Sequence, residues 1–152
     1  MTKIKSSELK MEMRLSAIEL LNQSLHLPVA SDSPATNFTF NINIESKADA
    51  VNKLVFVIVN VDIRNDDQSL ILGSLSVSCI YEIVNFEELI KTDTEGKYTI
   101  PQPMIEILNS ISISTIRGVM FSTFRGTFLH NAILPIVDPK QIQVAPTTVG
   151  TK

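Results

Sequence analysis

The sequence contains one cysteine, few charged residues and no long apolar run. A single cysteine, Cys79, excludes a disulfide within the chain. The chain has 13 basic and 16 acidic residues, and the basic residues form no patch, so we do not expect nucleic-acid binding. No run reaches the ~18 apolar residues of a membrane span, which argues against direct membrane insertion. The opening residues, "MTKIKSSELKMEMRLS", lack the apolar core of a signal peptide and predict a cytoplasmic protein.

Motifs of catalysis and cofactor binding are missing as well. The chain has no G-x-S-x-G, no phosphate-binding loop and no dinucleotide fingerprint. His26, His130 and Cys79 lie far apart in the sequence, whereas a metal site needs such ligands to converge. The adjacent acids Glu87 and Glu88 diverge in direction, which does not suit the facing pair of acid–base catalysis. The sequence therefore predicts a protein that is not an enzyme and binds no metal or cofactor.

Apolar residues, by contrast, are abundant. Hydrophobic residues make up 44% of the chain and charged residues 19%, and the mean hydropathy is +0.19. The length suits a single domain over residues 1–152, with loose ends at about 1–10 and 140–152. This apolar excess predicts that some apolar surface is covered by another subunit or stays open for a ligand.

Alternating apolar and polar residues predict strands over 37–45, 54–64 and about 70–84. Short polar connections favour antiparallel pairing, with one apolar face and one largely polar face. Residues 11–29 are ambiguous, since their first half has helical spacing and their second half alternates as a strand does. The apolar faces comprise Phe38, Phe40, Ile42 and Ile44, then Val55, Val57, Val59, Val61 and Ile63, then Ile71, Leu75, Val77, Cys79, Tyr81 and Ile83.

A long helix is predicted over residues 104–124. Its apolar residues cover two nearly opposite faces, so we expect the sheet on one side and a second subunit on the other. β-branched residues leave a strand over 111–116 as the alternative. Gly126 is expected to end the helix in a left-handed conformation, with Arg125 in the last turn. The residues assigned to the subunit interface are Ile113, Ile116, Met120 and Phe124.

Two shorter segments connect the strands to this helix. Residues 85–91 predict a short helix or turn with Asn85 as the N-cap, and residues 92–103 predict a polar loop. The whole order is then strand, strand, strand, strand, loop and long helix.

The motif Arg125-Gly126-Thr127-Phe128, followed by Leu134-Pro135, resembles the SecB family of export chaperones. The order of elements fits as well, and the resemblance covers about residues 11–139. It implies an α+β fold, with a four-stranded antiparallel sheet and one long helix packed on one face. It also implies an ATP-independent holdase that assembles as a homodimer or homotetramer and binds unfolded client polypeptides. Its further partners would be the export motor ATPase, or an antitoxin as a dedicated client.

Under this resemblance, the residues after Gly126 form an apolar strip that borders a groove for the client. The family carries a second helix after this strip, for which "DPKQIQVAPTTVGTK" is too short. It also presents acids on the exposed sheet face, where this chain offers Glu45, Asp62 and Glu82 among Asn, Thr and Ser, so strong motor docking is not expected. The predicted client-binding residues are Phe38, Phe40, Phe128, Leu129, Ile133, Leu134, Ile136 and Val137.

Two other functions stay open at this point. A small-molecule-binding or hydrolytic α+β protein would place His130 and a carboxylate in a closed apolar pocket. A structural adaptor would instead use all of its apolar surface in self-assembly.

Overall fold

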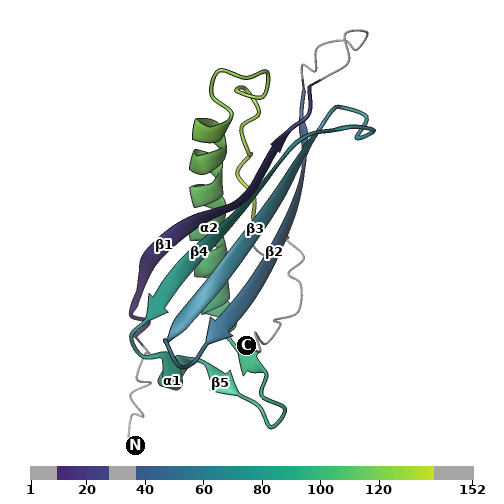
Figure 1. The fold of residues 1–152 in the computed structure, drawn as a ribbon. Coiled ribbons are helices and arrows are strands. Elements are labelled where there is room, and N and C mark those ends of the chain that lie inside the picture. The colour runs from purple at the N-terminus through teal and green to yellow at the C-terminus, as the bar shows by residue number, and fades with distance from the viewer. Residues whose placement is uncertain (1–9, 28–36, 139–152) are drawn as a thin grey trace, which may run out of the picture.

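The structure, a computed structural model, describes residues 10–27 and 37–138 (Figure 1). The loose ends expected at about 1–10 and 140–152 therefore lie almost entirely outside the described residues. The elements are β1 (Met13–Leu25), β2 (Thr39–Asp49), β3 (Leu54–Arg64), β4 (Ile71–Ile83), α1 (Phe86–Leu89), β5 (Lys91–Thr92), β6 (Tyr98–Thr99) and α2 (Gln102–Thr123).

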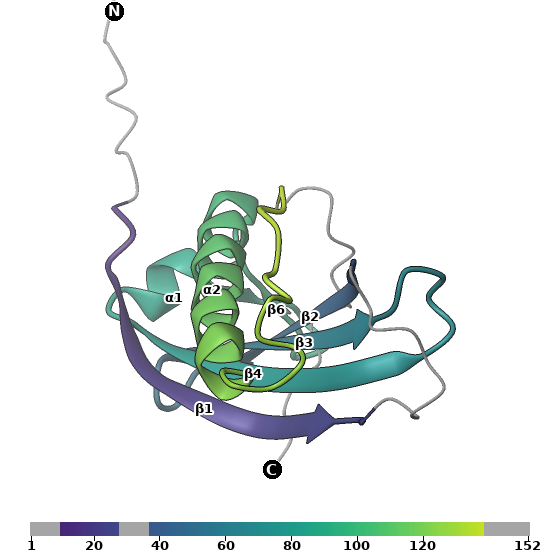
Figure 2. The same cartoon turned by 90° about the horizontal axis from the view of Figure 1, so that it is seen from above.

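Four long strands form one antiparallel sheet in the order β1-β4-β3-β2. The helix α2 packs against β3 and β4 on one face of the sheet, and the chain that follows it lies on the same side (Figures 1 and 2). We call this covered face the inner face and the opposite one the outer face. The arrangement confirms an α+β fold with a four-stranded antiparallel sheet and one long helix on one face.

The central strands follow their predicted alternation. Every second residue of β3 from Val55 to Ile63 is buried, and the residues between them are half-buried on the outer face. One assignment is wrong in β4, where Ile71 is 38% exposed and Leu72 is buried at 5%. The β3–β4 register shifts between the pairs made by Ile63 and Arg64, and this irregularity reverses the alternation at the start of β4.

The ambiguous N-terminal segment is a strand along most of its described length. Its pairing with β4 shifts register twice, between Leu15 and Ala17 and between Leu20 and Asn22. Each bulge adds one residue to β1, so apolar side chains on one face can stand three residues apart instead of two. The helical spacing of Leu15 and Ile18 has this origin, and both residues pair with inner-face positions of β4.

The connection between the sheet and α2 is more ordered than a polar loop. Residues 91–99 form the small hairpin β5–β6, with Gly96 at φ 79° in its turn. Asn85 stands at the N-cap position of α1, but its side chain makes no capping hydrogen bond. Instead, Nδ2 of Asn85 donates to the Lys10 carbonyl, and Oδ1 of Asn85 accepts from the main-chain amide of Glu12. Asn85 thereby holds the chain that leads into β1.

The helix α2 is continuous through 111–116, which excludes the strand alternative there. Prolines at its start need no intrahelical hydrogen bond, and Gly126 takes a φ of 78° three residues beyond its end. Arg125 lies past the last turn and is exposed, contrary to expectation. By length and hydropathy alone α2 meets the minimum for a membrane span. Its buried face lies on the sheet, however, as in the core helix of a globular protein.

A close approach at Gly73 ties three parts of the fold together. A Cβ there would lie 2.6 Å from Leu129 Cδ1 and 3.1 Å from the carbonyl oxygen of Ser24 in β1. We expect Gly73→Ala to lower the free energy of unfolding by about 1–3 kcal/mol in urea denaturation. Gly118→Ala is the control, because a Cβ on this exposed helix position meets nothing within 4 Å. Unchanged stability of Gly73→Ala would contradict the packing described.

Candidate functional site

The segment after α2, residues 127–138, forms the apolar strip that the sequence predicts. It begins with turns, in which the Thr127 amide donates to the Phe124 carbonyl and the Ala132 amide to the Leu129 carbonyl. It then runs back beside α2 without joining the sheet (Figures 1 and 2). Arg117 of α2 holds it by donating from Nε to the Leu134 carbonyl at 2.7 Å and from Nη2 to the Pro135 carbonyl at 2.9 Å.

The strip has both buried and exposed apolar side chains. Leu129 and Leu134 are each 1% exposed and belong to the core, so they anchor the strip and are out of reach of an external ligand. Sequence periodicity could not make this distinction, because the strip has no regular secondary structure. The client-binding candidates that remain accessible are Phe128 at 37%, Ile133 at 56% and Ile136 at 96%, with Val137 half-buried.

The other two candidates lie at the edge of the sheet. Phe40 is opposite Ile63 on the inner face of β2, and both Phe38 and Phe40 are half-buried against the core. Within the described sheet β2 pairs only with β3, so its outer edge offers unpaired main-chain groups. This edge therefore offers main-chain hydrogen bonding beside two half-buried aromatic side chains.

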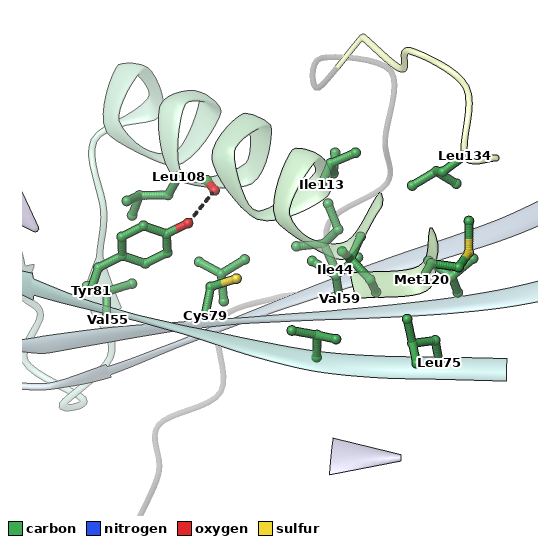
Figure 3. Packing of buried hydrophobic residues seen from close by; sticks show 14 of the residues in the cluster. Ile44, Val55, Val59, Leu75, Cys79, Tyr81, Leu108, Ile113, Met120 and Leu134 are labelled. Carbon is green, nitrogen blue, oxygen red and sulfur yellow. Dashed lines mark hydrogen bonds between the residues drawn. The ribbon is translucent and has the colours of Figure 1, made fainter. Parts of the chain in front are cut away.

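The predicted subunit interface needs correction. Ile113, Ile116, Met120 and Phe124 are 0–3% exposed within one chain, so they are core residues. The sequence assigned one apolar side of α2 to a second subunit because it did not show that the chain itself covers two sides. In the structure the sheet lies on one side, and the strip places Leu134 on another (Figure 3).

Exposed apolar residues lie instead on a different part of α2 and on β1. On the helix Ile107 and Ile111 are each 39% exposed and Phe121 is 55% exposed. The other edge strand contributes Leu15, Ile18 and Leu20, which are 38–48% exposed. We call these six residues the β1–α2 surface; sequence patterns missed its β1 part because the bulges obscured the strand.

A small polar cluster lies between the sheet and α2. The Tyr81 hydroxyl lies 2.7 Å from Ser112 Oγ and 3.3 Å from the Leu108 carbonyl, to which it donates (Figure 3). Burial raises the pKa of the Cys79 thiol and, more strongly, the pKa of the Tyr81 phenol. Both groups are therefore held neutral, and a buried neutral thiol has no nucleophilic character.

This burial makes stability depend on pH in the alkaline range. An unfolded tyrosine loses its proton near pH 10, whereas Tyr81 retains it in the folded protein. The contribution of Tyr81 to stability is therefore fully present below pH 10 and is lost as the pH rises above it. We expect Tyr81→Phe to lower the free energy of unfolding by about 1–2 kcal/mol at pH 7, because phenylalanine cannot form the hydrogen bonds of the tyrosine hydroxyl. The difference from wild type should shrink between pH 10 and 11 in urea denaturation. A difference that stays constant over this range would contradict the assignment.

His130, the residue that a catalytic pocket would need, lies in the turns at the start of the strip. His130 is exposed, and its amide donates to the Thr127 carbonyl within the strip's turns. A pocket of about 530 Å³ lies at the β2–β3 turn, with Lys47, Phe56 and Tyr98 in its wall, and His130 does not line it. Within residues 10–27 and 37–138, no three His, Cys, Asp or Glu side chains gather as metal ligands would.

The acids of the outer face are engaged with neighbouring side chains. Asp62 accepts a hydrogen bond from Ser74 Oγ at 2.7 Å. Glu82 forms an ion pair with Arg14 of β1, and Glu45 accepts a hydrogen bond from Nδ2 of Asn43 at 3.5 Å. This face therefore lacks a cluster of unpaired carboxylates in the described structure.

Comparison with solved structures identifies a related architecture. The SecB-like chaperone Rv1957 of Mycobacterium tuberculosis, in complex with a ChAD peptide from the Rv1956 HigA1 antitoxin, matches with a TM-score of 0.53 and 13% identity. The match covers 82% of this chain and 90% of that chain. The fold is SecB-like. A protein of unknown function from Streptococcus agalactiae matches with a TM-score of 0.37 and 12% identity, over 75% of this chain and 88% of that one. No protein family and no curated protein matches the sequence.

Proposed function

We propose that this protein is an ATP-independent holdase that binds unfolded polypeptide in a groove between the strip and the β2 edge. The observation that carries the proposal is the row of exposed apolar side chains on the strip, on the same side of the sheet as Phe38 and Phe40. The SecB-like neighbour supports it, because that chaperone was solved with a peptide bound.

The physical basis is burial and main-chain pairing. An apolar segment of a client gains about 25 cal/mol for each Å² of apolar surface removed from water. The free edge of β2 adds hydrogen bonds that do not depend on client sequence. Neither contribution needs nucleotide hydrolysis, a metal or an acid–base pair.

A dedicated client fits this chain better than general export. Docking to an export motor through the outer face would need available carboxylates, but those of Asp62 and Glu82 are occupied by Ser74 and Arg14. The neighbour's peptide comes from an antitoxin, so a client of that kind is our first candidate.

The β1–α2 surface supports a homodimer or homotetramer. It carries six large apolar side chains that are 38–55% exposed, and a second subunit could cover such a surface. A second copy is the occupant we propose, and it would also cover the free edge of β1.

Aggregation suppression tests the proposed function. We expect the wild-type protein, at equimolar subunit concentration and without nucleotide, to reduce light scattering from thermally unfolded citrate synthase by more than about half. His130→Ala should suppress aggregation equally well, because no proton transfer is involved. A wild-type protein without effect on two unrelated unfolded clients and on candidate antitoxins would refute the holdase proposal. Turnover of a small substrate that His130→Ala abolishes would favour the hydrolytic alternative.

A further inference from the structure

The pocket at the β2–β3 turn lies apart from the proposed client site. Its described lining residues come from the end of β2 and the turn, from β3 and from Tyr98 of β6. Phe40, the client-binding candidate of β2, is at the other end of this strand, about 23 Å from Lys47 at the usual rise of a strand. The pocket volume of about 530 Å³ falls within the roughly 300–1,000 Å³ of small-molecule sites. A small ligand therefore fits here.

The apolar part of the wall comes from two elements that meet at this end of the sheet (Figure 1). Phe56 and Ile58 stand two residues apart on β3, so both half-buried side chains lie on the outer face. Tyr98 packs its ring edge-on against buried Phe86, with centroids 6.2 Å apart and ring planes at 80°. This contact fixes the tyrosine ring, so the wall is formed before any ligand enters.

The acidic residue of the wall, Asp49, is engaged in holding the turn. Its Oδ1 accepts hydrogen bonds from two main-chain amides of the turn, at 3.0 and 3.1 Å. Its Oδ2 accepts from Nδ2 of Asn52 at 2.8 Å. Such a carboxylate stabilises the local turn conformation. Since N–H donors already meet both of its oxygens, Asp49 is not the group that would recognise a ligand.

The basic residue among the described lining residues is Lys47. It is half-buried on β2 and stands opposite Phe56 in the strand register. Within residues 10–27 and 37–138, no ion pair or side-chain hydrogen bond involves Lys47. Glu45, two residues away on the same face, accepts instead from Asn43. A partly desolvated ammonium group without a counter-ion favours an anionic ligand, because a charge-assisted hydrogen bond would replace its lost hydration.

We propose that this pocket binds a small monocarboxylic acid with an aromatic or aliphatic body. The body would pack against Phe56, Ile58 and Tyr98, and the carboxylate would pair with the ammonium group of Lys47. The apolar wall selects the body, and the single unpaired lysine selects one negative charge. The site holds its ligand without chemical change. This inference goes beyond the proposed function and does not depend on it.

Isothermal titration calorimetry with 4-phenylbutyrate tests the ligand class. We expect a Kd on the order of 100 µM, as suits a ligand of about 12 non-hydrogen atoms. The neutral 4-phenylbutanamide has the same body without the charge and should bind about 10-fold more weakly. Absence of 4-phenylbutyrate binding at millimolar concentration would overturn the proposal, and so would equal affinity for the acid and the amide. No client is needed, so the result is independent of the holdase assay.

Two lysine variants test the assigned charge. Lys47→Gln should weaken 4-phenylbutyrate binding about 10-fold and leave amide binding unchanged, because only the acid uses the ammonium group. The control is Lys53→Gln, which removes a lysine of the same hairpin that does not line the pocket, and it should keep the affinity for the acid within about twofold. Equal losses in the two variants would overturn the assignment, since the effect would then follow net charge.

A third variant tests the apolar wall. Phe56→Ala should weaken binding of the acid and the amide alike, by at least about 5-fold, since both lose the same apolar contact. Melting curves without ligand show whether each variant is folded. If folded Phe56→Ala bound both ligands as tightly as the wild type does, they would occupy another site and the proposal would fail. If Phe56→Ala did not fold, Ile58→Ala would test the same wall by the same criterion.

Discussion

Glutamate at position 113 should prevent folding and not merely separate subunits. Ile113 is 2% exposed and belongs to the buried hydrophobic core, where a carboxylate would have no partner (Figure 3). Burying an unpaired charge belongs to the few changes that cost more than about 4–5 kcal/mol. That is comparable with the whole stability of a domain this size, about 5–15 kcal/mol. We expect Ile113→Glu to show no cooperative thermal transition in circular dichroism.

The matched variant is Ile111→Glu, two residues away on the same helix. Ile111 is 39% exposed and belongs to the β1–α2 surface, so a charge there stays in contact with water in one subunit. This variant should keep its thermal transition but sediment at the mass of a monomer. If Ile113→Glu were a folded monomer, the interface predicted from the sequence would be supported after all. If the wild-type protein were a monomer at micromolar concentration, the proposed oligomer would be refuted.

Removing the exposed side chains of the strip should abolish most client binding. Ile133 is 56% exposed and Ile136 is 96% exposed, so both can change without opening the core. Burying an isoleucine fully against a client contributes roughly 1.5–3 kcal/mol. We expect the double variant Ile133→Ser/Ile136→Ser to lose about 3 kcal/mol of binding free energy, which is on the order of 100-fold in affinity. Anisotropy titration with an unfolded client measures it.

The control is a double variant in which two other exposed aliphatic side chains are changed to serine. Val51 and Val84 are 91% and 58% exposed, far from the strip in sequence, and Val51→Ser/Val84→Ser should leave affinity within about twofold. Leu129 is unsuitable for such a test, because its burial at 1% means that serine there would destabilise the fold. Equal losses in both double variants would mean that binding follows general hydrophobicity and not the strip.

The fold elements that sequence determined are those with a local period. Alternation in β2 and β3 identifies their inner faces correctly, because side chains of a strand point to opposite sides at every step. The length of α2 and the break near Gly126 follow from equally local rules on helix spacing and left-handed glycine. The motif around Gly126 and the order of these elements were enough to predict the SecB-like fold.

Tertiary structure decided what each apolar residue faces. The bulges of β1 depend on its pairing with β4, so its apolar edge was not readable as a strand. Leu134 is buried and Ile136 is exposed two residues later because α2, the sheet and Arg117 together position the strip. Burial is set by whichever segment packs against a side chain, and here that segment lies far away in the sequence. A periodicity within one segment contains no information about that partner.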